Sequence, residues 1–141
     1  MASGKVLALD FGRKRTGVAI SDERQVFAFG LTAIPTSDIF LFLKGIIEKE
    51  KPVCIVIGEA KRESGEDSEV EKLIQPLLNH LKNKYREIAV ERQDETLSSV
   101  KAVQSMVAAG FKKKDRRKKE NVDQMSATLI LQAFLERKQG S

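Results

Sequence analysis

An aspartate interrupts the most apolar stretch at the beginning of this chain. Residues 6–11 read VLALDF, and their apolar side chains would cover both faces of an extended strand, which is typical of a strand in the centre of a sheet. A carboxylate in such a strand is costly unless a cation, a base or a metal ion compensates it. We therefore interpret Asp10 as a metal-binding carboxylate that projects from the middle of a sheet. The alternative is that Asp10 caps the strand and accepts hydrogen bonds from the amides of the turn that follows.

The first half of the chain predicts an antiparallel meander followed by a parallel crossover. The first strand leads through a basic turn into a second strand, and the apolar residues 25–34 predict a third. Thr36 or Ser37 is expected to cap a helix, which Pro52 closes. Residues 53–58 are an apolar run of the buried-strand type. A strand, a helix and a strand in this order imply right-handed parallel pairing.

The second half of the chain adds one strand and three helices. Ser68 and Glu71 form a capping-box pattern at the start of a helix, and residues 87–92 alternate as a short edge strand does. Two further helices are expected to begin at Thr96 and near Glu120. These elements together indicate an α/β protein.

Length and cysteine content restrict the class of protein. A chain of 141 residues without internal repeats is expected to form one domain, residues 1–141, with a core of its own. Cys54 is the only cysteine, so we expect no disulfide framework and a reducing, cytoplasmic location. We expect neither a leader sequence nor a membrane-spanning segment, because the sequence shows neither pattern.

The positive charge of the chain is concentrated in one segment. The net charge is +5, and residues 112–119, KKKDRRKK, hold seven basic residues and one acidic residue. We expect a flexible basic loop here, which would attract the phosphates of a nucleic acid; the alternative is a merely solvated loop. A membrane is a weaker candidate because the segment lacks apolar anchors. The basic residues of the loop are Lys112, Lys113, Lys114, Arg116, Arg117, Lys118 and Lys119.

Three acidic residues lie where the apolar core meets a polar loop. Besides Asp10, Glu95 follows the last predicted strand and Asp123 opens the final helix. Asp123 continues a helical stripe, with spacings of four, three and four, formed by Ala127, Ile130 and Phe134. Its carboxylate should therefore point at the sheet. Each acid alone also has a simpler explanation: Asp123 would favour the dipole of a first helical turn, and Asp94 and Glu95 would be solvated capping residues before Thr96. The three together favour a functional site.

Carboxylates gathered in one place favour a divalent metal. Close carboxylates repel one another unless a cation lies between them, and Mg2+ and Mn2+ prefer oxygen ligands. Two such ions can activate a water and stabilise the leaving oxygen in phosphodiester hydrolysis. The sequence offers neither a zinc site of cysteine and histidine pairs nor a P-loop.

Three segments of the chain resemble the YqgF family of bacterial proteins. They are LALDFGRKRTGVAIS at residues 7–21, DETLSS at residues 94–99 and KKENVDQMSATLILQAFL at residues 118–135. That family is described as a pre-16S ribosomal RNA nuclease and as similar to Holliday junction resolvases. The resemblance implies a ribonuclease-H-like fold: a five-stranded mixed sheet of order 3-2-1-4-5, three strands antiparallel and then parallel, with helices on both faces.

The resemblance also implies roles for individual residues. Asp10, Glu95 and Asp123 match the acidic positions of the family motifs and would be both catalytic residues and ligands of Mg2+ or Mn2+. The chain departs from the family in the loop Gly58–Gly65, GEAKRESG, which lacks the usual asparagine, and at Thr96, where an arginine is usual. Neither departure removes a proposed metal ligand.

The favoured hypothesis is a metal-dependent endonuclease that processes the 5′ end of precursor 16S ribosomal RNA. Basic residues of the first turn, together with the basic loop, would hold backbone phosphates; those of the turn are Arg13, Lys14 and Arg15. One alternative is a Holliday junction resolvase that acts in DNA recombination or repair. Another is a non-catalytic nucleic-acid-binding module in rRNA maturation or transcription. An actin-like ATPase is less favoured, because it needs two such domains. Association with ribosomal particles is compatible with the favoured hypothesis, and the oligomeric state stays open.

Overall fold

Five strands form one mixed sheet in the computed structural model, which describes residues 4–59, 69–94 and 119–139. The strand order is β3-β2-β1-β4-β5, as predicted. Strand β1 pairs antiparallel with β2, and β2 with β3, whereas β4 is parallel to both β1 and β5. The strands are β1 (Val6–Phe11), β2 (Arg15–Ser21), β3 (Ala28–Pro35), β4 (Cys54–Glu59) and β5 (Ala89–Asp94).

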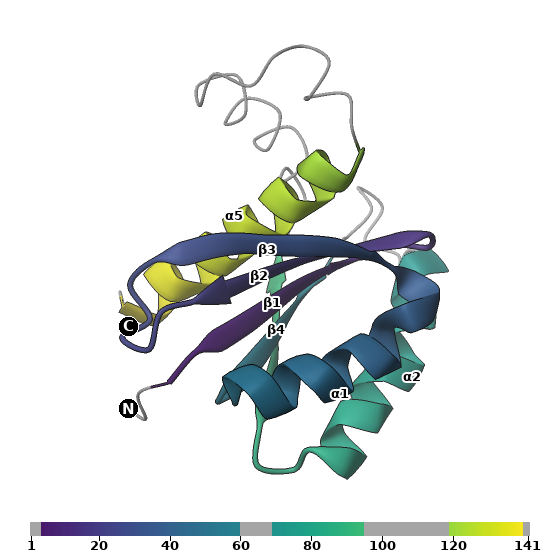
Figure 1. The fold of residues 1–141 in the computed structure, drawn as a ribbon, viewed down its shortest axis with the longest axis horizontal. Helices are drawn as coiled ribbons and strands as arrows, with labels where there is room; N and C mark the ends of the chain where they lie inside the picture. The colour runs from purple at the N-terminus through teal and green to yellow at the C-terminus, as the bar shows by residue number, and fades with distance from the viewer. Residues whose placement is uncertain (1–3, 60–68, 95–118, 140–141) are drawn as a thin grey trace.

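The helices form one layer on each face of the sheet (Figure 1). One face packs against α1 and α2, and the other packs against α5. The sheet therefore separates two hydrophobic clusters, which is the arrangement expected when a strand is apolar on both faces. The helical elements are the short 3-10 turn η1 (Thr36–Asp38), α1 (Ile39–Glu50), α2 (Glu69–Lys84) and α5 (Lys119–Gln139).

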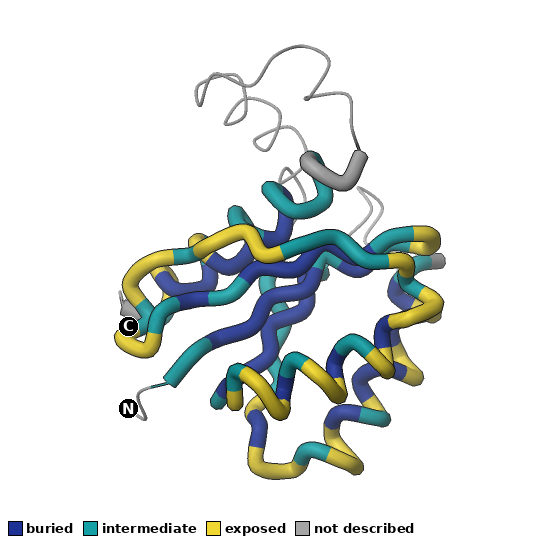
Figure 2. The backbone as a smooth tube through the Cα atoms, viewed as in Figure 1, coloured by how far each residue is buried: buried dark blue, intermediate teal, exposed yellow. Residues whose placement is uncertain are grey.

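Strand β1 lies at the centre of the sheet and is buried over most of its length (Figure 2). Leu7, Leu9 and Phe11 belong to the cluster under α1 and α2, whereas Val6 and Ala8 belong to the cluster under α5. Side chains alternate along a strand, so the residue after Leu9 lies on the α5 face. This alternation determines which helix faces the carboxylate of the strand.

The beginning of α1 differs from the prediction. Thr36 and Ser37 lie in η1, α1 begins only at Ile39, and no side chain caps either element. The Thr36 hydroxyl instead donates a hydrogen bond to the carbonyl oxygen of Gly12, over 2.6 Å. The prediction that Thr36 or Ser37 caps the helix was wrong because a contact distant in sequence uses the threonine hydroxyl.

Strand β3 begins at Ala28, later than the predicted residue 25. Gln25 has a positive φ of 60°, and the Asp22 carboxylate accepts hydrogen bonds from the backbone amides of Val26 and Phe27, each over 2.8 Å. This local carboxylate-to-backbone pairing holds residues 22–27 in a turn. It also holds the pKa of Asp22 below its usual value.

Glu71 at the start of α2 has a partner on another element of the fold. Its two carboxylate oxygens accept hydrogen bonds from Arg92 Nη2 at 2.8 and 2.7 Å, and Arg92 also donates to the carbonyl oxygens of Ile57 and Gly58. Through these hydrogen bonds Arg92 of β5 connects α2 with β4. Ser68, the other half of the predicted capping box, lies outside the described residues, as do the predicted helix from Thr96 to residue 110 and residues 112–118 of the basic loop.

The helices within the described ranges include none that is both long and apolar enough to span a membrane.

Helix α5 provides most of the buried surface on its face of the sheet, which gives a stability prediction. Phe134 is 1% exposed, so Phe134→Ala should lower the free energy of unfolding by about 3–5 kcal/mol, because it leaves a cavity in the core. Leu41→Ala is the matched control: Leu41 is 76% exposed and its truncation should change stability by less than about 0.5 kcal/mol. Urea denaturation followed by circular dichroism measures both, and equal losses would contradict this packing.

Candidate functional site

Gly17 in β2 brings two of the predicted carboxylates together. It lies directly opposite Asp10 in the β1–β2 ladder, and residues directly opposite in antiparallel strands carry their side chains on the same face. A Cβ atom built on Gly17 would lie 2.0 Å from the carbonyl oxygen and 2.5 Å from the carbonyl carbon of Asp123 in α5. Opposite Cβ positions are about 5 Å apart. Asp10 Cβ and the Asp123 carbonyl therefore lie within about 8 Å of one another.

Asp123 takes the position that its helical spacing predicted. Ala127, Ile130 and Phe134 are buried on the sheet, each 1% exposed or less, and Asp123 continues this stripe to the end of the sheet where Asp10 lies. Arg15 Nε donates a hydrogen bond to Asp123 Oδ2 over 3.1 Å. The side chains of this ion pair are 31% and 27% exposed. The ion pair restrains Asp123 while leaving it in reach of solvent.

The basic turn beside the carboxylates is fixed by threonine hydroxyls. Thr16 is fully buried, and its hydroxyl lies 2.9 Å from that of Thr36. Besides its bond to the Gly12 carbonyl, Thr36 donates its backbone amide to the carbonyl oxygen of Lys14, over 2.9 Å. The turn is thus attached to η1 at both of its ends. Arg13 and Lys14, which it carries, are exposed, as a phosphate-binding turn requires.

Glu95, the third predicted carboxylate, lies outside the described residues. Strand β5 ends one residue before it, at Asp94, which pairs with Glu59 at the end of β4. Because β1, β4 and β5 are mutually parallel, their carboxyl ends meet at one edge of the sheet. Strand β5 therefore ends at the edge where Asp10 lies. The proximity of Glu95 to the other two acids stays a prediction.

The donor atoms around Gly17 favour a hard cation. Asp10 and Asp123 supply carboxylate oxygens, which suit Mg2+ or Mn2+. The described part of the chain contains no group of three histidine, cysteine or acidic residues that could hold a metal ion, and Glu95, the third predicted ligand, lies outside it. His80, which lies in α2 on the opposite face, packs edge-on against the ring of Phe40 at 4.7 Å.

The cysteine is unsuited to act as a ligand or nucleophile. Burial raises the pKa of the Cys54 thiol to about 12, and the negative charge of the neighbouring Glu91 carboxylate adds to this. The thiol lies 3.8 Å from Glu91 Oε2. A thiol with so high a pKa stays protonated at neutral pH, whereas metal binding and nucleophilic attack need the thiolate.

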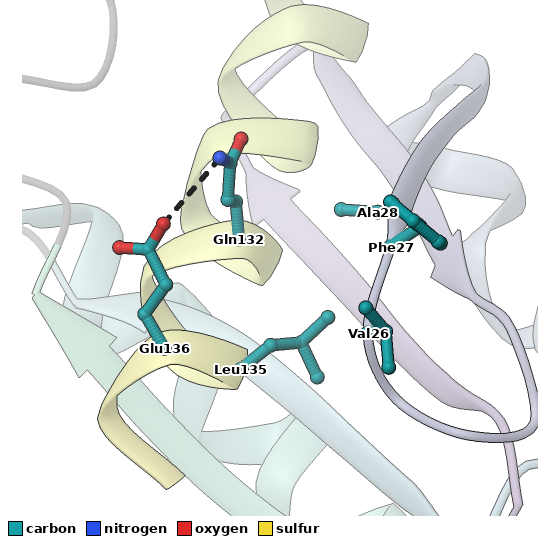
Figure 3. Close-up of a pocket in the computed structure, with 6 residues that line it drawn as sticks. All are labelled: Val26, Phe27, Ala28, Gln132, Leu135 and Glu136. Carbon is teal, nitrogen blue, oxygen red and sulfur yellow. Dashed lines mark hydrogen bonds between the residues drawn. The ribbon is translucent and has the colours of Figure 1, made fainter. Parts of the chain in front are cut away.

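A hollow of about 160 Å3 lies at the other end of the sheet, between the start of β3 and α5 (Figure 3). It is bordered by Val26, Phe27 and Leu135, and a hydrogen bond of 3.4 Å joins Gln132 Nε2 to Glu136 Oε1 beside it. Ala28, which also lines the hollow, pairs with Ser21 at the end of β2 remote from Gly17. This hollow therefore takes no part in the carboxylate site.

Two residues that support the site were not identified from the sequence. Gly17 is the only residue without a side chain in β2, and a glycine inside a strand often marks the close approach of another backbone. That pattern was available in the sequence but does not say which backbone approaches. Thr36 had no such signal, because its hydrogen-bond partner is 24 residues away in the chain.

The chain matches a family model over residues 4–137, described as RuvX, Holliday junction resolvase. A protein of Bacteroides thetaiotaomicron is 46% identical over 134 residues, covering 95% of this chain and 97% of that protein. A protein of Flavobacterium psychrophilum is 43% identical over 134 residues, covering 95% and 98%. Both bear the name "Putative pre-16S rRNA nuclease".

Solved structures with the same fold are resolvases. RuvC of Thermus thermophilus, in complex with a Holliday junction substrate, aligns with a TM-score of 0.63 and 12% identity over 98% of this chain and 97% of that chain. The yeast mitochondrial Holliday junction resolvase Ydc2 aligns with a TM-score of 0.59 and 14% identity over 98% and 82%. These likenesses confirm the predicted ribonuclease-H-like fold.

The close approach at Gly17 gives a mutational prediction. Gly17→Ala would press its Cβ into the backbone of α5 and should lower the free energy of unfolding by about 1–3 kcal/mol, because the helix must move away. Gly45→Ala in α1 is the matched control, since a Cβ there meets nothing within 4 Å, and should stabilise the protein by up to about 1 kcal/mol. Thermal unfolding distinguishes the two; equal midpoints would contradict the close approach.

The thiol gives a prediction about pH and reactivity. Ellman's reagent should label native Cys54 far more slowly near neutral pH than it labels the urea-unfolded chain. The unfolded chain loses the thiol proton near the ordinary pKa of 9.0, whereas the native state retains it to about 12. The contribution of this group to stability should therefore fall as the pH rises across that window. Glu91→Gln should lower the thiol pKa and speed native labelling, and rapid labelling of the parent protein would contradict the assignment.

Proposed function

Because this chain belongs to the RuvX family of Holliday junction resolvases, we propose that it is a metal-dependent endonuclease that hydrolyses phosphodiester bonds in structured nucleic acid. We propose the 5′ end of precursor 16S ribosomal RNA as its substrate, on the basis of the names of its relatives. A four-way DNA junction is the second candidate, which the description of the family favours. Both substrates present the same phosphodiester to the same site.

The observation that carries this proposal is the juxtaposition of two carboxylates at Gly17. Asp10 on β1 and Asp123 on α5 face the same space at the edge of the sheet. Packing alone does not explain either acid. A central strand and the buried stripe of a helix are expected to carry apolar side chains at these positions, because a buried carboxylate without a partner is costly. Two acids this close repel one another, which favours a site that takes up positive charge.

The residues fit a divalent cation. Asp10, Asp123 and Glu95 would hold Mg2+ or Mn2+. When bound, such an ion activates a water and stabilises the developing charge on the leaving oxygen. Gly17 allows α5 to come close enough for this ligand set, because any side chain there would hold the helix away from β2.

The other residues of the site orient these acids and bind the substrate. Arg15 restrains the Asp123 carboxylate through Oδ2, which limits the rotamers available to that acid. Arg13 and Lys14 project from a turn anchored by Thr36 and would hold the phosphates on either side of the cleaved bond. The basic residues 112–119 would add contacts that are independent of sequence and weaken with salt.

The test is cleavage of a precursor rRNA fragment and of a synthetic four-way DNA junction, each with Mg2+, Mn2+ or EDTA. Asp10→Asn and Asp123→Asn keep the side-chain shape and remove the charge. Each should lower the cleavage rate by at least about a hundredfold, because loss of an outer-shell partner alone commonly costs 10–100-fold.

Glu48→Gln is the matched control for charge removal, since Glu48 is an exposed acid on α1, away from the carboxylates. It should leave cleavage unchanged. Metal-dependent cutting of one substrate, lost in both aspartate variants, identifies the substrate and the site together. Equal cutting by parent and Asp10→Asn would overturn the nuclease proposal, and binding without cleavage would favour a non-catalytic module.

A further inference from the structure

A groove of about 300 Å3 opens on the face of the sheet opposite to the carboxylates, beside the same edge. It lies where the N-terminal parts of α1 and α2 meet the end of β1 and the basic turn. This volume is at the lower end of the range for small-ligand sites, which is the size class of a single base. The lining residues are Phe11, Arg13, Thr36, Ser37, Ile39, Phe40, Leu73, Pro76 and Leu77.

The groove has a buried apolar floor and exposed apolar walls. The floor is formed by Phe11, Ile39 and Leu77, which are 8%, 3% and 1% exposed. The walls are Phe40 on α1 and Leu73 on α2, which are 45% and 49% exposed. Removing apolar side chains of this size from water is favourable, so exposed apolar side chains that line a groove favour an apolar ligand in it.

The end of the groove nearest the sheet edge is polar. Arg13 and Ser37 are exposed there, beside the Thr36 hydroxyl. Phe11 of the floor directly follows Asp10, whose side chain lies on the other face of the sheet. A ligand in the groove thus has a cation and hydroxyls at one end, next to the carboxylate site, and apolar walls at the other. A nucleotide has the same division, with a phosphate at one end and a base at the other.

The aromatic wall is held in place from behind. The ring of Phe40 packs edge-on against His80, with centroids 4.7 Å apart and an interplanar angle of 75°. His80 in turn packs edge-on against Tyr85 at 6.1 Å. A ring supported in this way loses little conformational freedom when a ligand stacks on it, which favours binding.

We propose that this groove binds one unpaired base of the nucleic acid, stacked on Phe40, while the phosphate of that nucleotide lies at Arg13. The inference rests on the proposed function, because it assumes that the strand crosses the sheet edge at Asp10. It specifies the substrate further: a base near the cleaved bond must be unpaired and turned away from its neighbours. Stacking on an aromatic side chain accepts any base, so the groove selects for an unpaired base rather than for a sequence.

The test is binding in EDTA, so that cleavage plays no part. The probe is a short single-stranded oligonucleotide that carries one 2-aminopurine flanked by abasic sites. Phe40→Ala should weaken its binding about 5- to 150-fold, the range expected for loss of one stacked base, and should abolish the change in 2-aminopurine fluorescence. Phe40→Leu, which keeps an apolar side chain but removes the ring, should give the same loss of signal and guards against a folding defect.

Leu41→Ala is the matched control, because Leu41 is the neighbouring exposed apolar residue on α1 and does not line the groove. It should bind the probe as the parent does, and a fully abasic oligonucleotide should bind parent and Phe40→Ala equally weakly. Equal binding of the 2-aminopurine probe by the parent and Phe40→Ala would overturn the inference.

The outcome is separable from that of the nuclease test. Glu48→Gln, which removes the charge of an exposed acid on α1 that does not line the groove, should bind the probe as the parent does in EDTA. Cleavage that depends on Asp10, together with unchanged binding by Phe40→Ala, would keep the nuclease and remove the base site. Absence of cleavage, together with lost binding by Phe40→Ala, would keep the base site and remove the nuclease.

Discussion

The contact between the backbone of α5 and Gly17 of β2 is the constraint on which the site depends. The Asp123 carbonyl lies 2.0 Å from where a Cβ of residue 17 would be, so the helix reaches the sheet only because that side chain is missing. The same contact places the beginning of α5, which carries Asp123, over β2. Gly17 of β2 is the residue that pairs with Asp10. A helix held one side chain further away would still cover the core, but would not bring the two carboxylates together.

The sheet edge connects two surfaces of different chemistry. Carboxylates face α5 on one side, and an apolar groove lies between α1 and α2 on the other. The turn between β1 and β2 joins them, because Thr36 bonds it to the beginning of the α1 layer while Arg15 bonds its far end to Asp123. The exposed cations of this turn are therefore positioned to contact a nucleic acid strand that passes from one surface to the other.

The sequence was a reliable guide to the elements and a weaker guide to their ends. Periodicity predicted the succession of strands and helices along the chain and the buried face of α5, because burying apolar residues decides both, whereas the family resemblance predicted the order of strands within the sheet. The start of α1 was wrong because a polar side chain has a partner far away in the chain: Thr36 bonds Gly12 rather than capping its helix. Residue 25 was assigned to a strand because the Asp22 turn was not recognised.

The sequence by itself determined that Asp10 stands in a central strand and that Asp123 continues a buried helical stripe, because both follow from the local alternation of apolar residues. Only the tertiary structure decided that these two acids share one space. That result depends on the pairing of Asp10 with Gly17 and on the missing side chain under α5. The groove beside Phe40 is likewise tertiary, since its walls come from two helices separated by a strand, and no local pattern records how such elements meet.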